Sequence, residues 1–200
     1  AHAFQELDQH YLDAAVTDGQ RLIQKMSMTI DDFRNFFRPD KQSIRFNLHT
    51  IIQETLQLVD ASLKNHGIAV TLHVDKAAAV QGYPNEYSQV LLNILTNAKD
   101  AIVESGVNHG RIDIGLNVAE NMAAVTVADN GGGVPSGILE KIFDPYFTTK
   151  EKGTGIGLYM SKMIIENNMK GTLRADNVDH GAVFSIACPI AKNPQKALHE

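Results

Sequence analysis

The chain has 200 residues, of which 44% are hydrophobic and 20% are charged, a balance typical of a globular protein rather than a disordered one. A net charge of −5 leaves no basic excess to neutralise phosphates, which excludes a general nucleic-acid-binding protein. The single cysteine, Cys188, excludes an internal disulfide framework and fits a reducing compartment, and no apolar run approaches the ~18 residues that span a bilayer.

Residues 1–39 are predicted to form a long helix. Its apolar and small residues alternate at spacings of four and three, a heptad pattern, and Pro39 ends it. A helix with this seam needs a partner, from an upstream segment, from a second copy, or from both; packing on the following domain is the alternative. The seam comprises Leu12, Val16, Gly19, Ile23, Met26, Ile30, Phe33 and Phe37.

Residues 44–191 are predicted to form an α+β domain, an α/β sandwich with helices on one face of one sheet, followed by a tail at 192–200. The inward positions expected on the first helix are Ile51, Thr55, Leu58 and Leu63. The pattern predicts strands at 43–48, 68–74, 78–83, 111–118, 123–129, 171–175 and 183–187, and helices at 50–65, 84–104 and 156–167.

Three polar residues share one face of the predicted helix 84–104. Asn93, Asn97 and Asp100 recur at intervals of four and three residues, while apolar residues occupy the other faces. Such a stripe is costly when simply buried, and amide oxygens are hard ligands that suit Mg²⁺. The stripe therefore indicates a wet cavity with a candidate metal ligand; a solvated face or an internal capping network is the structural alternative.

A carboxylate and a glycine cluster follow the predicted strand 123–129. Asp129 ends the strand, and Gly131 and Gly133 lie in the turn after it. A buried carboxylate at a strand end can accept a hydrogen bond from an exocyclic amine, and glycines let the backbone approach a flat ring. An ordinary Asp-Asn-Gly turn is the alternative.

The stretch 134–152 is long, partly polar and bounded by glycine clusters, as in a mobile lid. It contains Phe143, Phe147 and Lys150. The run that follows precedes a helix, whose free backbone N–H groups can bind phosphate oxygens. This run is Gly153-Thr154-Gly155-Ile156-Gly157-Leu158, and it has neither the Walker spacing nor the strand that precedes a Rossmann fingerprint.

In this order, the Asn-bearing helix, Asp-x-Gly-x-Gly, the Phe-bearing lid and Gly-Thr-Gly-Ile-Gly-Leu resemble the Bergerat ATP-binding fold of the GHKL superfamily. The resemblance runs from about Phe46 to Pro189. Within the superfamily the chain is most similar to bacterial sensor histidine kinases, and the segment Met28–Pro39 is similar to the second helix of their dimerisation and phosphotransfer hairpin.

The resemblance implies that ATP and Mg²⁺ are the cofactors. Asn97 would coordinate Mg²⁺ on the ATP phosphates with Asn93 assisting, and Asp129 would take the adenine amino group. Asp100 would support the site, and Lys150 would contact phosphate or remain a solvated charge. Of the others, Gly131 and Gly133 would shape the base pocket, Phe143 and Phe147 would anchor the lid, and Gly153, Thr154, Gly155, Ile156, Gly157 and Leu158 would close over the phosphates.

Asn93 bears on the reaction. The ATP-hydrolysing branches of the superfamily have Glu at this position, and a carboxylate there can deprotonate a water whereas an amide cannot. The resemblance therefore implies a kinase that passes the γ-phosphoryl to a histidine for relay to an aspartate of a response regulator. An ATPase that drives conformational change, with Glu86 or Asp100 as its base, and a non-catalytic dimerising module are the alternatives.

The phosphoacceptor is the part of the pattern that the sequence lacks. None of the histidines matches the acceptor box, although His10 lies on a predicted helix. The chain starts at Ala1 without Met, so we expect the acceptor helix to lie upstream. Any membrane attachment is expected there too, with this domain cytoplasmic and dimeric through residues 1–39. The histidines are His2, His10, His49, His66, His73, His109, His180 and His199.

Overall fold

The computed structural model describes residues 12, 15–17, 19–20, 23, 42–150 and 153–191. The chain divides into two compact units, 1–41 and 42–200. The described residues of the first unit are helical, and the seam residues Leu12, Val16 and Ile23 are exposed. The rest of the predicted helix, including His10, and the tail at 192–200 lie outside the described residues, so dimerisation stays a prediction.

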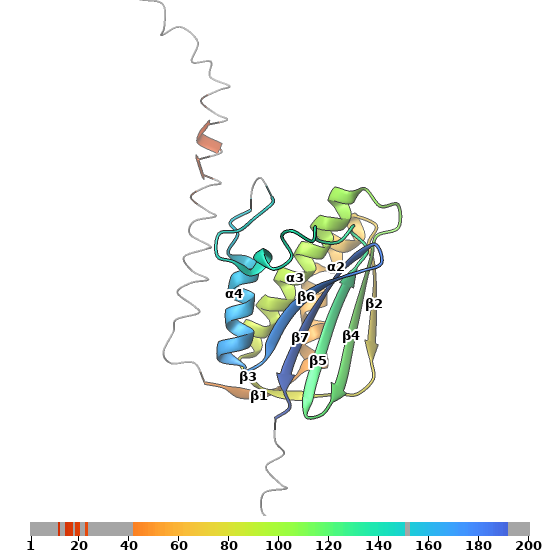
Figure 1. The fold of residues 1–200 in the computed structure, drawn as a ribbon, viewed down its shortest axis with the longest axis vertical. Coiled ribbons are helices and arrows are strands. Elements are labelled where there is room, and N and C mark those ends of the chain that lie inside the picture. The colour runs from red at the N-terminus through yellow and green to blue at the C-terminus, as the bar shows by residue number, and fades with distance from the viewer. Residues whose placement is uncertain are drawn as a thin grey trace, which may run out of the picture. The chain divides into compact units, whose positions relative to one another are not determined.

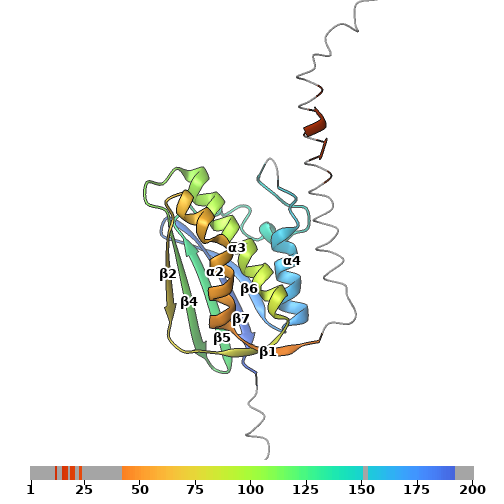
Figure 2. The ribbon, with the colours of Figure 1, turned by 180° about the vertical axis from the view of Figure 1, so that it is seen from behind.

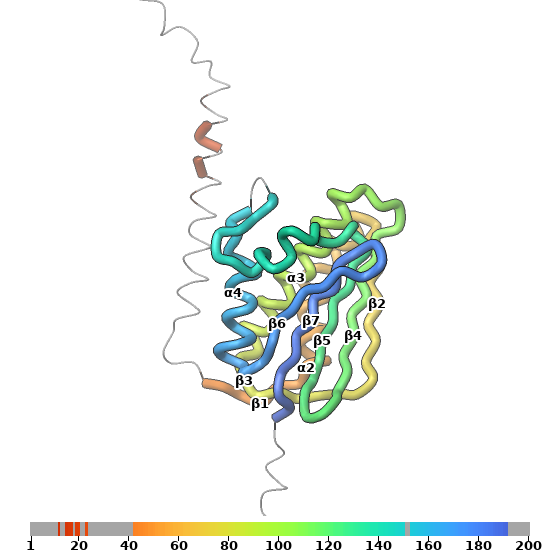
Figure 3. Tube along the Cα trace, in the orientation of Figure 1, coloured from red at the N-terminus to blue at the C-terminus, as the bar shows by residue number. Residues whose placement is uncertain are grey.

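A five-stranded mixed sheet forms one layer of the second unit (Figures 1 and 3). Its strand order is β2-β4-β5-β7-β6, in which β2 and β4 are parallel and the other neighbours are antiparallel. The strands are β2 (Ala69–Val74), β4 (Arg111–Ala119), β5 (Met122–Asp129), β6 (Thr172–Val178) and β7 (Gly181–Pro189).

Three helices cover one face of this sheet, as seen from behind in Figure 2. The predicted α/β sandwich is confirmed. The helices are α2 (Leu48–Asn65), α3 (Pro84–Ser105) and α4 (Gly157–Met163); α4 continues into one π-helical turn, η2 (Ile164–Asn168), and the short 3-10 helix η1 (Lys141–Phe143) lies before it.

Local signals set the ends of α3. Pro84 is its first residue, where the missing N–H costs no hydrogen bond, and Gly106 caps its other end with a left-handed φ of 66°. Between these ends the apolar face is buried, with Val90 and Ile94 fully covered. The helix is therefore fixed on the sheet, and its polar stripe is held in a defined direction.

The expected orientation of α2 is wrong at one position. Ile51, Thr55 and Leu63 are buried as predicted, but Leu58 is 70% exposed. The buried stripe passes through Val59 instead, and consecutive residues of an α-helix are turned by about 100°. Thr55 is satisfied in the core because its hydroxyl donates to the carbonyl of Ile51 at 2.8 Å.

The prediction of a single sheet is also wrong, because β1 (Ile44–Asn47) and β3 (Ala79–Gly82) form a separate antiparallel pair. This pair lies at one end of the sandwich (Figure 1). In the part of the chain that the structure describes, no helix is long and apolar enough to cross a membrane.

Candidate functional site

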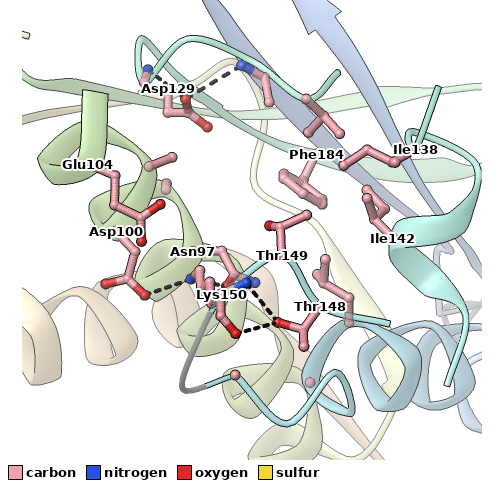
Figure 4. Close-up of a pocket in the computed structure, with 18 of the residues that line it drawn as sticks. Asn97, Asp100, Glu104, Asp129, Ile138, Ile142, Thr148, Thr149, Lys150 and Phe184 are labelled. Atoms are coloured by element: carbon pink, nitrogen blue, oxygen red, sulfur yellow. Dashed lines mark hydrogen bonds and ion pairs between the residues drawn. The ribbon is translucent and has the colours of Figure 1, made fainter. Parts of the chain in front are cut away.

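A cavity of about 1020 Å³ lies within the second unit, between α3, the end of β5 and the segment that connects β5 to α4. Figure 4 shows side chains from these elements pointing into it. The predicted site residues that line it are Asn93, Asn97, Asp100, Asp129, Gly131, Gly133, Phe147, Lys150, Gly153, Thr154, Gly155, Gly157 and Leu158.

Asp129 is the buried carboxylate of the cavity. In β5 the residues Ala123, Val125 and Val127 face the helices, and the two-residue period places Asp129 on the same side. Its Oδ1 accepts hydrogen bonds from the N–H of Gly131 at 2.8 Å and of Ala182 at 3.5 Å. Burial raises the pKa of Asp129, although both hydrogen bonds act to lower it. Its Oδ2 accepts no hydrogen bond from any described residue, and so it is available to a ligand donor.

Two of the three glycines after Asp129, Gly131 and Gly133, lie where the chain has no room for a side chain. A Cβ on Gly131 would lie 2.7 Å from the backbone of Ala101 in α3. Gly133 has a φ of 77°, and a Cβ there would meet Asn177 Oδ1 at 2.9 Å. The Asn177 side chain also bonds the N–H and the carbonyl of Val134, at 2.7 and 2.6 Å. The floor of the cavity is therefore a closely packed backbone surface, as a flat ring requires.

The two asparagines of α3 make different contacts. Asn93 donates to the hydroxyl of Ser161 at 3.0 Å, and a Cβ on Gly157 would lie 2.6 Å from its Oδ1, so Asn93 packs tightly against α4. Asn97 lies one turn further along α3, and its Oδ1 accepts a hydrogen bond from the ammonium of Lys150 at 3.0 Å. The amide oxygen of Asn97 thus already contacts a cation.

Asp100 forms an ion pair with the same ammonium. Lys150 Nζ lies 2.6 Å from Asp100 Oδ2, and Lys99 Nζ lies 3.4 Å from Asp100 Oδ1. Burial pushes the pKa of Asp100 up, but the hydrogen bond and charge of Lys150, with a smaller contribution from Lys99, outweigh it and lower the pKa. Asp100 is therefore ionised at neutral pH.

The segment predicted as a lid is anchored on the sheet. The ring of Phe143 packs edge-on against Phe184 of β7 with centroids 6.5 Å apart, and Lys162 Nζ lies 5.1 Å from the Phe143 centroid. Phe147 lines the cavity. The packing of Phe143 agrees with its predicted role as a hydrophobic anchor, and the anchoring role of Phe147 stays a prediction.

The glycine run connects the lid to α4. Gly155 has a φ of 66°, and a Cβ there would collide with the carbonyl carbon of Tyr146. The structure does not bring Ile156 to the cavity wall, although its neighbours on both sides reach it. Ile156 is instead the N-cap of α4, and its carbonyl accepts the N–H of Met160 at 2.9 Å.

Residues 82–192 match the family described as histidine kinase-, DNA gyrase B- and HSP90-like ATPases. The chain belongs to this ATPase family. Sporulation kinase A of Bacillus subtilis (strain 168) is 30% identical over 188 residues, which cover 92% of this chain and 30% of the kinase. Signal transduction histidine-protein kinase AtoS of Escherichia coli (strain K12) is 33% identical over 193 residues, which cover 94% and 30%.

Solved structures agree with this membership. The catalytic domain of histidine kinase ThkA has a TM-score of 0.67 and 31% identity, with 74% of this chain and 96% of that one covered. ThkA in complex with the response regulator protein TrrA gives a TM-score of 0.69 at 26% identity, covering 96% and 53%. The chain thus contains the ATP-binding domain of sensor histidine kinases and spans 30% of the length of each curated relative named above.

Several cavity residues of this ATPase domain were not predicted. Glu104 lies one turn beyond Asp100 on α3, so the spacing of the polar stripe could have found it. Thr148 and Thr149 adjoin Lys150, whereas Phe184 comes from a strand that carries no motif. The full unpredicted set is Ala98, Ala101, Glu104, Ser105, Val134, Pro135, Ile138, Ile142, Thr148, Thr149, Ala182 and Phe184.

The remaining reactive side chains of the described part of the ATPase domain lie elsewhere. None of its five histidines lines the cavity. Cys188 is buried, and burial raises the pKa of its thiol to about 12, so the thiolate is scarce at neutral pH. Cys188 is therefore a packing residue of the core.

Proposed function

We propose that this chain is the ATP-binding kinase module of a two-component sensor histidine kinase. It would transfer the γ-phosphoryl of ATP to a histidine for relay to an aspartate of a response regulator. The observation that carries the proposal is the convergence of Asn97, Asp129 and Gly155 on one cavity. Membership of the ATPase family and the similarity to histidine kinases support the choice of reaction.

Asp129 is assigned to the adenine ring. Its Oδ1 is engaged by the two backbone N–H groups, which leaves Oδ2 to accept the exocyclic amine. The close approach of Gly131 to Ala101 provides a thin wall on which a purine can lie. The carboxylate can only accept, which favours the amino group of adenine over the carbonyl oxygen of guanine.

Asn97 is assigned to Mg²⁺. The donor set fits, since its amide oxygen is a hard ligand that faces a cation in the structure, the ammonium of Lys150 at 3.0 Å. Among the described residues no cluster of three or more His, Cys, Asp or Glu side chains could hold a metal, so phosphate oxygens and waters would complete the coordination. When bound, Mg²⁺ supplies charge neutralisation on the phosphate oxygens.

The glycine run is assigned to the phosphates. The positive φ of Gly155 and its contact with the backbone of Tyr146 bring the lid against the start of α4. Backbone N–H groups of Thr154 and Gly157 would face the phosphate oxygens, and Leu158 would close the wall behind them. Gly153, whose N–H donates to the carbonyl of Lys150 at 3.0 Å, would shape the wall beside the phosphates. Ile156 is left without a direct contact in this assignment.

The positions of the candidate bases favour phosphoryl transfer over hydrolysis. Asn93 cannot deprotonate water, and its amide is committed to Ser161. Glu86 is buried and accepts a hydrogen bond from Asn168 at 2.8 Å, away from the cavity wall. Asp100 is held between two ammonium groups. Neither candidate for the hydrolytic alternative is thus placed to activate a water.

The partners follow from the same proposal. ThkA has been solved in complex with the response regulator protein TrrA, and we assign a partner of the same class to this chain. The heptad seam of residues 1–39 is assigned to homodimerisation, which its exposed positions Leu12, Val16 and Ile23 favour. The domain would act in the cytoplasm.

Phosphotransfer in trans tests the proposal. The chain is incubated with Mg²⁺ and γ-labelled ATP, and a separate histidine-bearing acceptor hairpin is added. We expect acid-labile, base-stable label on the acceptor, with phosphate release at least about tenfold slower than this labelling, because neither Glu86 nor Asp100 is placed to activate a water. An acceptor whose histidine is replaced by alanine is the control. Steady phosphate release without labelling would favour the ATPase alternative.

A further inference from the structure

The ammonium of Lys150 bridges two residues of α3 that lie 53 and 50 positions away in the sequence. It contacts Asn97 Oδ1 at 3.0 Å and Asp100 Oδ2 at 2.6 Å. Figure 4 shows the three side chains together, with a dashed line between Lys150 and Asp100. The side chains of Lys150 and Asp100 are only 32% and 31% exposed. This ion pair is therefore better shielded from water than a surface pair, and its charge-assisted hydrogen bonds are correspondingly stronger.

The backbone around Lys150 is fixed by its neighbours in the lid. The hydroxyl of Thr148 accepts the N–H of Lys150 at 3.1 Å, and the carbonyl of Lys150 accepts the N–H of Gly153 at 3.0 Å. A Cβ on Gly153 would collide with Thr148 Oγ1 and meet Lys150 Cβ at 3.2 Å. A contact between Lys150 and α3 therefore restrains the lid backbone on both sides of the lysine.

Both oxygens of Asp100 are engaged by cations. Oδ2 binds Lys150 and Oδ1 faces Lys99 at 3.4 Å. The carboxylate of Asp100 therefore acts on the lysine of the lid. This role is different from direct contact with the cofactor. The amide oxygen of Asn97 faces the same lysine, and a divalent cation at that oxygen would be repelled by the ammonium.

We propose that Asp100 is a positioning residue, which holds the ammonium of Lys150 on Asn97 so that the lysine takes the place of the nucleotide's Mg²⁺ until Mg-ATP displaces it. The proposal rests on the proposed function, because the displacement requires a metal-nucleotide at Asn97. While Asp100 retains Lys150, the lysine cannot neutralise the phosphates. The site then depends on Mg²⁺ to neutralise the phosphates. Before nucleotide binds, the lid remains in contact with α3 through Lys150.

Amide hydrogen exchange of the lid, measured in the full chain without nucleotide, tests whether the contact of Lys150 with Asp100 restrains the lid. Asp100→Asn and Lys150→Met are each expected to speed exchange at residues 146–150 and 153–158 by about tenfold, since both remove the same charged contact. The double variant should exchange no faster than either single one. Asp60→Asn is the matched control, because it breaks the exposed Lys64–Asp60 pair at 2.8 Å on α2 and should leave the lid unchanged.

The preference of the site for ATP with Mg²⁺ over ATP without it tests whether Mg-ATP displaces Lys150. General damage to the site would weaken both forms of binding and leave this preference unchanged. Dissociation constants are measured for ATP with Mg²⁺ and with EDTA. Asp100→Asn is expected to lower the dissociation constant in EDTA, relative to the constant with Mg²⁺, by at least about fivefold. The reason is that the freed Lys150 can neutralise phosphates when the metal is absent. Equal losses with and without Mg²⁺ would overturn the displacement.

The two proposals fail in distinguishable ways. The positioning role would be overturned if the lid of Asp100→Asn or Lys150→Met exchanged as slowly as the wild-type lid, or if the effects added in the double variant. Nucleotide binding by the wild type would remain intact in either case. A wild-type chain that bound no nucleotide would overturn the proposed function, and with it the displacement by Mg-ATP.

Discussion

Asn97→Ala is expected to weaken the binding of Mg-ATP by about 100-fold, because it removes the amide oxygen that we assign to the metal. Binding of ATP in EDTA should change by less than about threefold, since no metal bridges the phosphates to α3 under that condition. Isothermal titration calorimetry with and without Mg²⁺ measures both values. The change should therefore appear almost entirely in the metal-dependent part of the affinity.

The matched control for this variant is Asn117→Ala. Asn117 is also an asparagine, but it is exposed on β4 and does not line the cavity. Its replacement should leave both affinities unchanged. If Asn97→Ala bound Mg-ATP as tightly as the wild type does, the assignment of Asn97 to the metal would fail.

Asp129→Asn is expected to lower ATP affinity by about 10- to 100-fold and to reduce the preference for ATP over GTP by a similar factor. A hydrogen bond to a charged group contributes about 1.5–3 kcal/mol, and an asparagine amide can donate to the carbonyl oxygen of guanine. The fold should persist, since Asn Oδ1 can accept the N–H of Gly131 and of Ala182. Competition binding with ATP and GTP measures the change, and an unaltered preference would contradict the adenine assignment.

The raised pKa of Asp129 adds a pH dependence with a defined sign. In the proposed assignment the adenine amine binds the carboxylate, so ATP affinity should fall as the pH drops through this pKa, at a higher pH than for an ordinary aspartate. Stability should change in the opposite direction. The folded state holds this proton more tightly than the unfolded state, so Asp129 lowers the free energy of unfolding as the pH rises from the unfolded to the folded pKa. Asp129→Asn should remove both effects.

The fold was largely predictable because its signals are local. Pro84 and Gly106 mark the ends of α3 through backbone geometry alone, and the alternation of residues 123–129 places Asp129 on the buried face. The errors arose where several elements decide together. Leu58 lies beside the buried stripe of α2, and only the position of the neighbouring elements determines which side is covered. The separate pairing of β1 with β3 joins residues 32 to 38 positions apart in the sequence, from Asn47 with Ala79 to Ile44 with Gly82.

The cavity was predictable to the extent that its residues lie in motifs. The predicted residues supplied about half of its wall, but Phe184 reaches it from β7, where a strand pattern shows only that the residue faces inward. The contacts of Lys150 with Asn97 and Asp100 could not be derived from the sequence. They depend on how the lid folds back over α3, and no spacing within either segment encodes that approach.

Paramagnetic relaxation by Mn²⁺ with a non-hydrolysable ATP analogue tests most directly whether Asn97, Asp129 and Gly155 surround one metal-nucleotide. In the isotope-labelled full chain, we expect the side-chain amide of Asn97 and the backbone amides of residues 153–157 to broaden first. Asn121, in the turn at the opposite end of β5 from Asp129, should stay sharp. Broadening centred on another surface, with the Asn97 signal unchanged, would contradict the account.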